Sequence, residues 1–129
     1  MTYIELVNRI TRSVYAYTAA FVEVSAFPGD IAIRPIKRSS SIVLASFWIR
    51  ILQRYFQSIP RICNEVSIRG ARDSKSEYFQ FILRDFIISV TMKTGEIKFK
   101  GAGAVKFFRD ELFYILSCHS KADSVPTLR

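Results

Sequence analysis

The sequence predicts a single α+β domain in which a mostly antiparallel sheet carries helices on one face. Three observations lead to this fold class. The chain of 129 residues is long enough for one core but not for two. Apolar residues recur with helical spacing in some segments and with strand spacing in others, in the order α-ββ-α-βββ-α. Short turns join neighbouring strands, which favours antiparallel pairing.

Domain boundaries follow from the same patterns. We expect one domain over residues 1–119, because the periodicity runs to that point. Residues 120–129 lose the periodicity and include Pro126, so we expect a flexible C-terminal tail there.

The first helix begins with a capping signal. Thr2 and Glu5 have capping-box spacing, in which a hydroxyl and a carboxylate satisfy free amides at a helix start. We expect the helix to end near Tyr17 or Thr18. Its predicted apolar stripe consists of Tyr3, Val7, Ile10, Val14, Tyr17 and Phe21.

Residues 20–36 are typical of a β-hairpin. The turn is predicted at Phe27-Pro28-Gly29-Asp30, where Pro28 presets φ and Gly29 supplies the positive φ of a type II turn. β-Prone residues flank it on both sides.

Ser39, Ser40 and Ser41 supply N-cap candidates for a second helix, which we expect to run to about Ser58, before Pro60. The predicted buried stripe is Ala45, Trp48, Leu52, Tyr55 and Ile59, widened by Ile49 and Phe56. A short strand at Val66 and Ile68 should end at Gly70, and residues 71–77 should form a polar connector.

The segment 78–92 has strand periodicity that is interrupted at Arg84-Asp85. A strand, a bulge and a second strand fit this pattern, and so do one long bent strand or a tight hairpin. Residues 96–100 alternate cleanly as a further strand. Gly101 and Gly103 precede the last helix, whose predicted stripe is Val105, Phe108, Leu112, Ile115 and His119.

The reactive side chains do not form a catalytic motif. His119 is the single histidine, and it does not have metal-ligand spacing with Cys63 or Cys118. We expect two reduced thiols, no metal, no cofactor and no enzymatic activity. The Gly101-Ala102-Gly103 segment has the position of a phosphate-binding turn, but lacks the residues of a dinucleotide or P-loop motif. A tight strand-to-helix turn is the favoured interpretation.

Charge is the strongest functional signal in the sequence. The net charge is +8, and positive residues are concentrated in two segments without acidic residues, 31–64 and 97–109. Such a charge attracts polyanions, nucleic acid above all. The predicted phosphate contacts are Arg34, Lys37, Arg38, Arg50, Arg54, Lys98 and Lys100, with Tyr78 as a stacking platform.

The sheet offers a surface for these residues. If helices cover the face that carries Ile97 and Phe99, the opposite face stays open. This open face would then carry Lys98, Lys100, Ser89, Thr91, Gln80 and Tyr78.

Two functions therefore compete. The first is a non-enzymatic nucleic-acid-binding domain for single-stranded DNA or RNA, in an intracellular protein that is cytoplasmic or nucleoid-associated and has no membrane segment. The second is a structural or adaptor subunit of a protein complex or homo-oligomer, such as a homodimer. It rests on apolar residues outside the predicted helix stripes, namely Leu44, Phe47, Ile51, Phe107 and Phe113.

Overall fold

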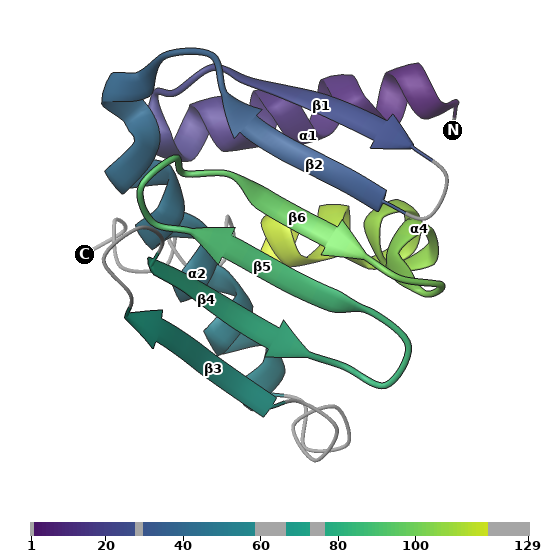
Figure 1. The fold of residues 1–129 in the computed structure, drawn as a ribbon. Helices are drawn as coiled ribbons and strands as arrows, with labels where there is room; N and C mark the ends of the chain where they lie inside the picture. The colour runs from purple at the N-terminus through teal and green to yellow at the C-terminus, as the bar shows by residue number, and fades with distance from the viewer. Residues whose placement is uncertain (1, 28–29, 59–66, 73–76, 119–129) are drawn as a thin grey trace, which may run out of the picture.

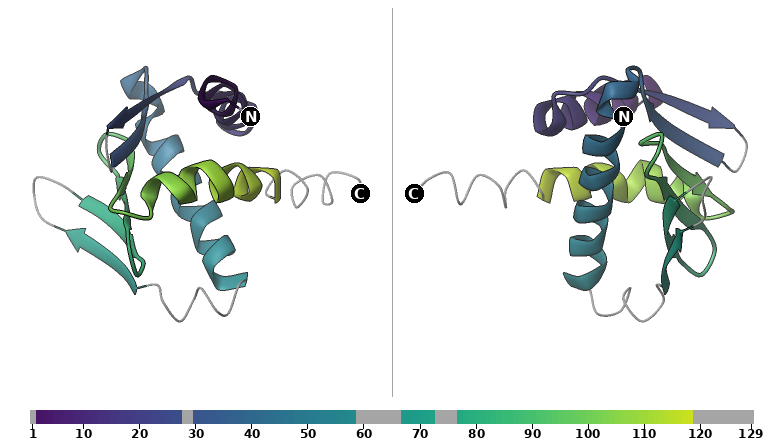
Figure 2. Two further views of the ribbon diagram at one scale, coloured as in Figure 1. Left: turned by 90° about the vertical axis from the view of Figure 1, so that its right-hand side faces the viewer. Right: turned by 60° about the vertical axis from the view of Figure 1, so that its left-hand side comes forward.

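A computed structural model describes residues 2–27, 30–58, 67–72 and 77–118 of the chain. Six antiparallel strands form one sheet in the order β1-β2-β6-β5-β4-β3, and the helices lie behind it (Figure 1). Viewed from the side, the sheet is one layer and the helices form a second layer on one of its faces (Figure 2). The predicted α+β class, the antiparallel sheet and the one-sided helices are confirmed.

The elements follow the predicted order with one difference. They are α1 (Tyr3–Thr18), β1 (Val22–Phe27), β2 (Asp30–Pro35), the 3-10 turn η1 (Arg38–Ser40), α2 (Ser41–Ser58), β3 (Ser67–Arg72), β4 (Glu77–Ile82), β5 (Ile87–Thr91), β6 (Ile97–Lys100), α4 (Ala104–Phe107) and the π-helical segment η2 (Phe108–Leu112). Residues 113–118 continue the last helix. Four strands follow α2 instead of three.

The additional strand comes from segment 78–92, which is a tight hairpin. β4 and β5 pair in antiparallel register, and the amide of Leu83 donates to the carbonyl of Phe86 across the turn at 3.0 Å. The predicted polar connector is also shorter than expected, because Ala71 and Arg72 belong to β3 and Glu77 begins β4. Backbone pairing between β3 and β4 extends both strands into the polar segment that was expected to be a connector.

Several predictions concern residues outside the described ranges. These are the turn at Pro28 and Gly29, the end signal at Pro60, the thiol of Cys63, His119 and the tail over 120–129. The hairpin that Pro28 and Gly29 connect is confirmed by the pairing of β1 with β2.

The start of α1 is built as predicted. The Thr2 hydroxyl accepts a hydrogen bond from the Glu5 amide at 3.2 Å. The buried side consists of Leu6, Ile10 and Val14. The predicted stripe is wrong at both ends, because Tyr3 and Phe21 are exposed. Since the helix ends at Thr18, Phe21 lies beyond it.

Ala19 ends α1 in a left-handed conformation. Its φ is 57° and its amide donates to the Tyr15 carbonyl at 2.8 Å. The Thr18 hydroxyl donates to the Val14 carbonyl at 2.7 Å and accepts from the Ala20 amide at 3.1 Å. Glycine is the usual residue at such a position, because a Cβ is unfavourable there.

α2 is buried over a wider arc than its predicted stripe. Leu44, Phe47 and Ile51 are all buried, so the expectation that they mark a protein interface is wrong. The reason is that α2 contacts β5 on one side and α1 on another, and its Phe56 ring lies against Phe107 of α4. The apolar residues outside the stripe therefore belong to the core.

Phe107 connects four parts of the core. Its ring centroid lies 5.0 Å from that of Phe86, 5.9 Å from Phe99 and 6.2 Å from Phe56. These rings belong to the β4–β5 turn, β6 and α2. Phe107 was also expected at an interface, and its burial corrects that prediction. Phe113 is half-buried, with the Arg9 guanidinium 5.8 Å from its ring centroid.

The last helix departs from regular α-helical geometry. Phe108, Leu112 and Ile115 are buried as predicted, whereas Val105 is exposed. The π-helical turn Phe108–Leu112 has a wider repeat than an α-helix. It keeps Phe108 and Leu112 facing the core together.

Replacing Phe107 by alanine should destabilise the protein by about 3–5 kcal/mol, because the change leaves a cavity among three rings. Denaturant unfolding followed by the fluorescence of buried Trp48 measures this loss. Val105→Ala is the matched control, two residues earlier in the same helix. It should change stability by less than about 0.5 kcal/mol because Val105 is exposed. A similar loss in both variants would contradict the central role of Phe107.

Ala19→Gly should stabilise the protein by roughly 0.5–1 kcal/mol, because glycine adopts the left-handed conformation without a Cβ penalty. The matched control is Ala16→Gly in the exposed part of α1, which should destabilise by about 1 kcal/mol. Thermal or denaturant unfolding of both variants gives the two signs. A destabilising effect of Ala19→Gly would refute the strain at this helix end.

Candidate nucleic-acid interface

The sheet has one face that no described helix covers. Ile97 and Phe99 of β6 are buried under the helices, whereas Lys98 and Lys100 are exposed on the opposite face. The register continues this face across the sheet, since Lys98 pairs with Ser89. The predicted open face is therefore confirmed.

Tyr78 and Gln80 of β4 lie on the same face. The Gln80 amide donates to the Ser89 hydroxyl at 3.1 Å, and Tyr78 pairs with Thr91. The Tyr78 side chain is half-buried, which limits the ring surface that a ligand can reach. Neighbouring strands are about 4.8 Å apart, so Tyr78 on β4 lies about 14 Å from the position of Arg34 on β2.

The charges of the open face largely compensate one another. The Arg34 guanidinium lies 3.5 Å from the Glu23 carboxylate and 3.8 Å from that of Glu96, and the Lys98 ammonium lies 3.6 Å from Glu96. Arg34 also donates to the Ser25 hydroxyl at 3.3 Å. Such exposed pairs contribute little stability, but they offset the positive charge of the sheet.

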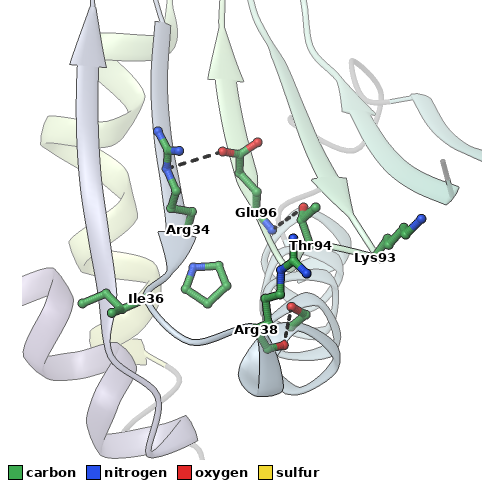
Figure 3. A pocket seen from close by; sticks show the side chains of 8 residues that line it. Arg34, Ile36, Arg38, Lys93, Thr94 and Glu96 are labelled. Atoms are coloured by element: carbon green, nitrogen blue, oxygen red, sulfur yellow. Dashed lines mark hydrogen bonds and ion pairs between the residues drawn. The ribbon is translucent and has the colours of Figure 1, made fainter. Parts of the chain in front are cut away.

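A cationic depression lies at one end of this face, where β2 leads into α2. We call it the junction pocket; its volume is about 560 Å³. Figure 3 shows that its side chains come from β2, from η1 and from the β5–β6 turn. The lining residues are Arg34, Pro35, Ile36, Arg38, Ser41, Lys93, Thr94 and Glu96.

The junction pocket depends on a close contact between a turn and a helix start. Gly95 has a φ of +72°, and a Cβ at this position would lie 2.6 Å from the Ser41 carbonyl oxygen. Only glycine therefore lets the β5–β6 turn rest on the first residue of α2. This contact brings Lys93 and Arg38 into one pocket.

The helix start at this pocket is electropositive, and the acidic lining residue, Glu96, already pairs with Arg34 and Lys98. Neither η1 nor α2 has an acidic residue in its first turn, and Lys37 at the N-cap makes no side-chain cap. Arg38 and Lys93 form no ion pair among the described residues. Cations beside a helix N-terminus are repelled by the positive end of the helix dipole. An anion bound here would offset both the dipole and the unpaired positive charge.

Arg50 and Arg54 do not share this site. Both are exposed on the side of α2 opposite its buried residues Trp48 and Leu52. At 1.5 Å per residue, Arg50 lies about 18 Å along the helix from Arg38. The predicted site residues therefore form two groups. One lies at the junction pocket and on the open face of the sheet, and the other is the pair Arg50 and Arg54 on α2.

Lys93 is a residue of the junction that the sequence did not single out. It lies in the Lys93-Thr94-Gly95 turn, outside both acid-free segments. Lys93 lines the same pocket as Arg38 because this turn packs on α2, although its side chain points away from Arg38 (Figure 3). No local pattern in the sequence signals this placement.

The Gly101–Gly103 turn is filled by the protein itself. The Gly103 amide donates to the Asp85 carbonyl at 3.1 Å, and a Cβ on Gly103 would lie 2.6 Å from the Asp85 carboxylate. The anion beside this helix start is thus the protein's own side chain. The tight-turn interpretation fits, and a phosphate site does not.

The described residues hold no group of three metal-ligating side chains. Cys118 is a free, exposed thiol. Over the described parts of the chain, no helix has the length and apolarity that a membrane crossing requires.

Among the described residues, Tyr55 has a strongly raised pKa. Burial between the helices, followed by the charges of Glu111, Tyr114 and Cys118, raises the pKa of Tyr55 to about 12. Burial and the neighbouring Asp110 also raise the pKa of Glu111, while Lys106 lowers it. These groups join α2 to the last helix, and they lie on elements behind the sheet.

One tyrosine should therefore titrate at about pH 12, and Tyr55→Phe should remove that step. Because the pKa is raised in the folded state, its contribution to stability is complete below the unfolded value of 10.0 and is lost as the pH rises through about 12. Ultraviolet absorbance of phenolate measures the titration. An unchanged late step in Tyr55→Phe would show that another tyrosine is responsible.

No protein-family model matches this chain, and neither a curated protein nor a solved structure matches it. Its function therefore has to follow from its own residues.

Proposed function

We propose that this protein is a non-enzymatic domain that binds single-stranded nucleic acid, with the junction pocket as its principal phosphate site. The observation that carries the proposal is that Arg38 and Lys93 line one pocket at the start of α2, whose first turn has no acidic residue. Glu96 also lines this pocket, but its carboxylate pairs with Arg34 and Lys98. Phosphate is the anion that such a site fits, because it accepts hydrogen bonds from guanidinium, ammonium and backbone amides together.

A repeating polyanion is favoured over a single small anion because the cations extend beyond the pocket. Lys37 lies beside it on the chain, and Lys100 is exposed on the adjacent face of the sheet, where Lys98 pairs with Glu96. The net charge of +8 would steer a nucleic acid toward this surface. A single strand is favoured because the described helix starts do not form a helix-turn-helix pair for a duplex groove.

The double variant Arg38→Ala/Lys93→Ala should bind a single-stranded oligonucleotide more weakly than the wild type, with a shallower salt dependence. Each lost phosphate contact should reduce the slope of log affinity against log salt by about 0.7. Fluorescence anisotropy over a range of salt concentrations measures both quantities.

The matched control is Arg50→Ala/Arg54→Ala, which removes the same charge from the exposed side of α2. It should leave the slope near that of the wild type. Equal effects of the two double variants would mean diffuse attraction without a pocket. No binding by the wild type at low salt would reject the function.

A further inference from the structure

Phe21 and Tyr15 form an exposed pair of aromatic rings. The two side chains are 58% and 45% exposed. Their ring centroids are 4.6 Å apart with an angle of 30° between the planes, so one ring supports the other. Single exposed apolar side chains are common on proteins, but two adjacent rings offer a larger flat apolar surface than one side chain does.

This pair lies next to the junction pocket. The Ile36 amide donates to the Phe21 carbonyl at 3.0 Å, which extends the β1–β2 hairpin by one step. Ile36 is itself 61% exposed and lines the pocket, as Figure 3 shows. The Phe21 backbone is thus hydrogen-bonded to a residue that lines the pocket.

We propose that Phe21, supported by Tyr15, stacks on an unpaired base of a nucleic-acid strand whose phosphate occupies the junction pocket. This inference rests on the proposed function and adds the chemistry that would select a single strand. A duplex keeps its base faces inside the stack, whereas an unpaired base presents a face to a ring. Cations for phosphate beside a ring for a base are the two parts that such binding needs.

The geometry favours Phe21 over Tyr78, the ring that the sequence suggested. Tyr78 is half-buried in the middle of β4, and its neighbours on the open face are polar, as the Gln80–Ser89 hydrogen bond shows. Phe21 is more exposed and lies one residue from the pocket.

Binding of two oligonucleotides of equal length and charge tests the inference. One is oligothymidylate, and the other is the same backbone with abasic sites. Phe21→Ala should weaken binding of oligothymidylate roughly 5- to 150-fold, the range expected for loss of one stacking ring, and leave binding of the abasic strand unchanged. Phe21→Leu should retain the apolar surface but lose most of the stacking, and Tyr78→Ala should change the oligothymidylate affinity less than Phe21→Ala does.

The outcomes separate this inference from the proposed function. Equal affinity of wild type and Phe21→Ala for oligothymidylate, or an equal loss for both strands, would overturn the stacking role. If Arg38→Ala/Lys93→Ala still weakens the binding of both strands, the junction pocket remains the proposed phosphate site even though the stacking role is rejected. If the wild type binds neither strand, both proposals fail. Because Phe21 is exposed, Trp48 fluorescence should confirm that each Phe21 variant is folded.

Discussion

The pairing of β2 with β6 is the interaction on which the rest of the molecule depends. Ile31 lies opposite Phe99 and Ile33 opposite Ile97, and all four are buried. This pairing joins the N-terminal hairpin to the four-stranded meander β3–β6, which are far apart in the sequence. Closing so large a loop costs entropy that these apolar cross-strand pairs and the overlying helices must offset. Because α2 begins directly after β2, the same pairing places its N-terminus beside the β5–β6 turn.

The positions of the charged residues in the fold matter more than their number. The sheet face carries lysines and an arginine, yet Glu23 and Glu96 pair with Arg34 and Lys98. The surplus lies at the junction pocket, where Arg38 and Lys93 form no ion pair among the described residues, although Glu96 lines the same pocket. A count of basic residues cannot distinguish these two situations, because screening by a neighbouring carboxylate depends on distances of a few ångströms.

The sequence was informative about local structure and less so about where segments meet. The cap at Thr2 and the alternation in β6 predict their elements because the signals lie within a few residues. The predicted serine cap of α2 differs: Ser39 and Ser40 belong to η1, and the Ser41 hydroxyl donates to the Arg38 carbonyl at 2.7 Å. Which side of a helix is buried depends on all of its neighbours, so Phe107 was placed at a surface although it lies in the core. Lys93 and Phe21 belong to the candidate site only because distant segments pack together, and periodicity alone assigned Phe21 to a buried stripe.

The π-helical turn Phe108–Leu112 gives the last helix one residue more per turn than its regular neighbours need. The turn takes up the extra residue locally, so the α-helical parts before and after it keep their facing. Deleting one residue inside the turn would let it close to regular α-helical geometry, with Ile115 and Leu116 still buried. Deleting one residue from the α-helical part that follows would instead rotate everything after it by about 100° and turn buried side chains toward solvent. The chain length is thus adjustable by one residue within this turn and fixed beyond it.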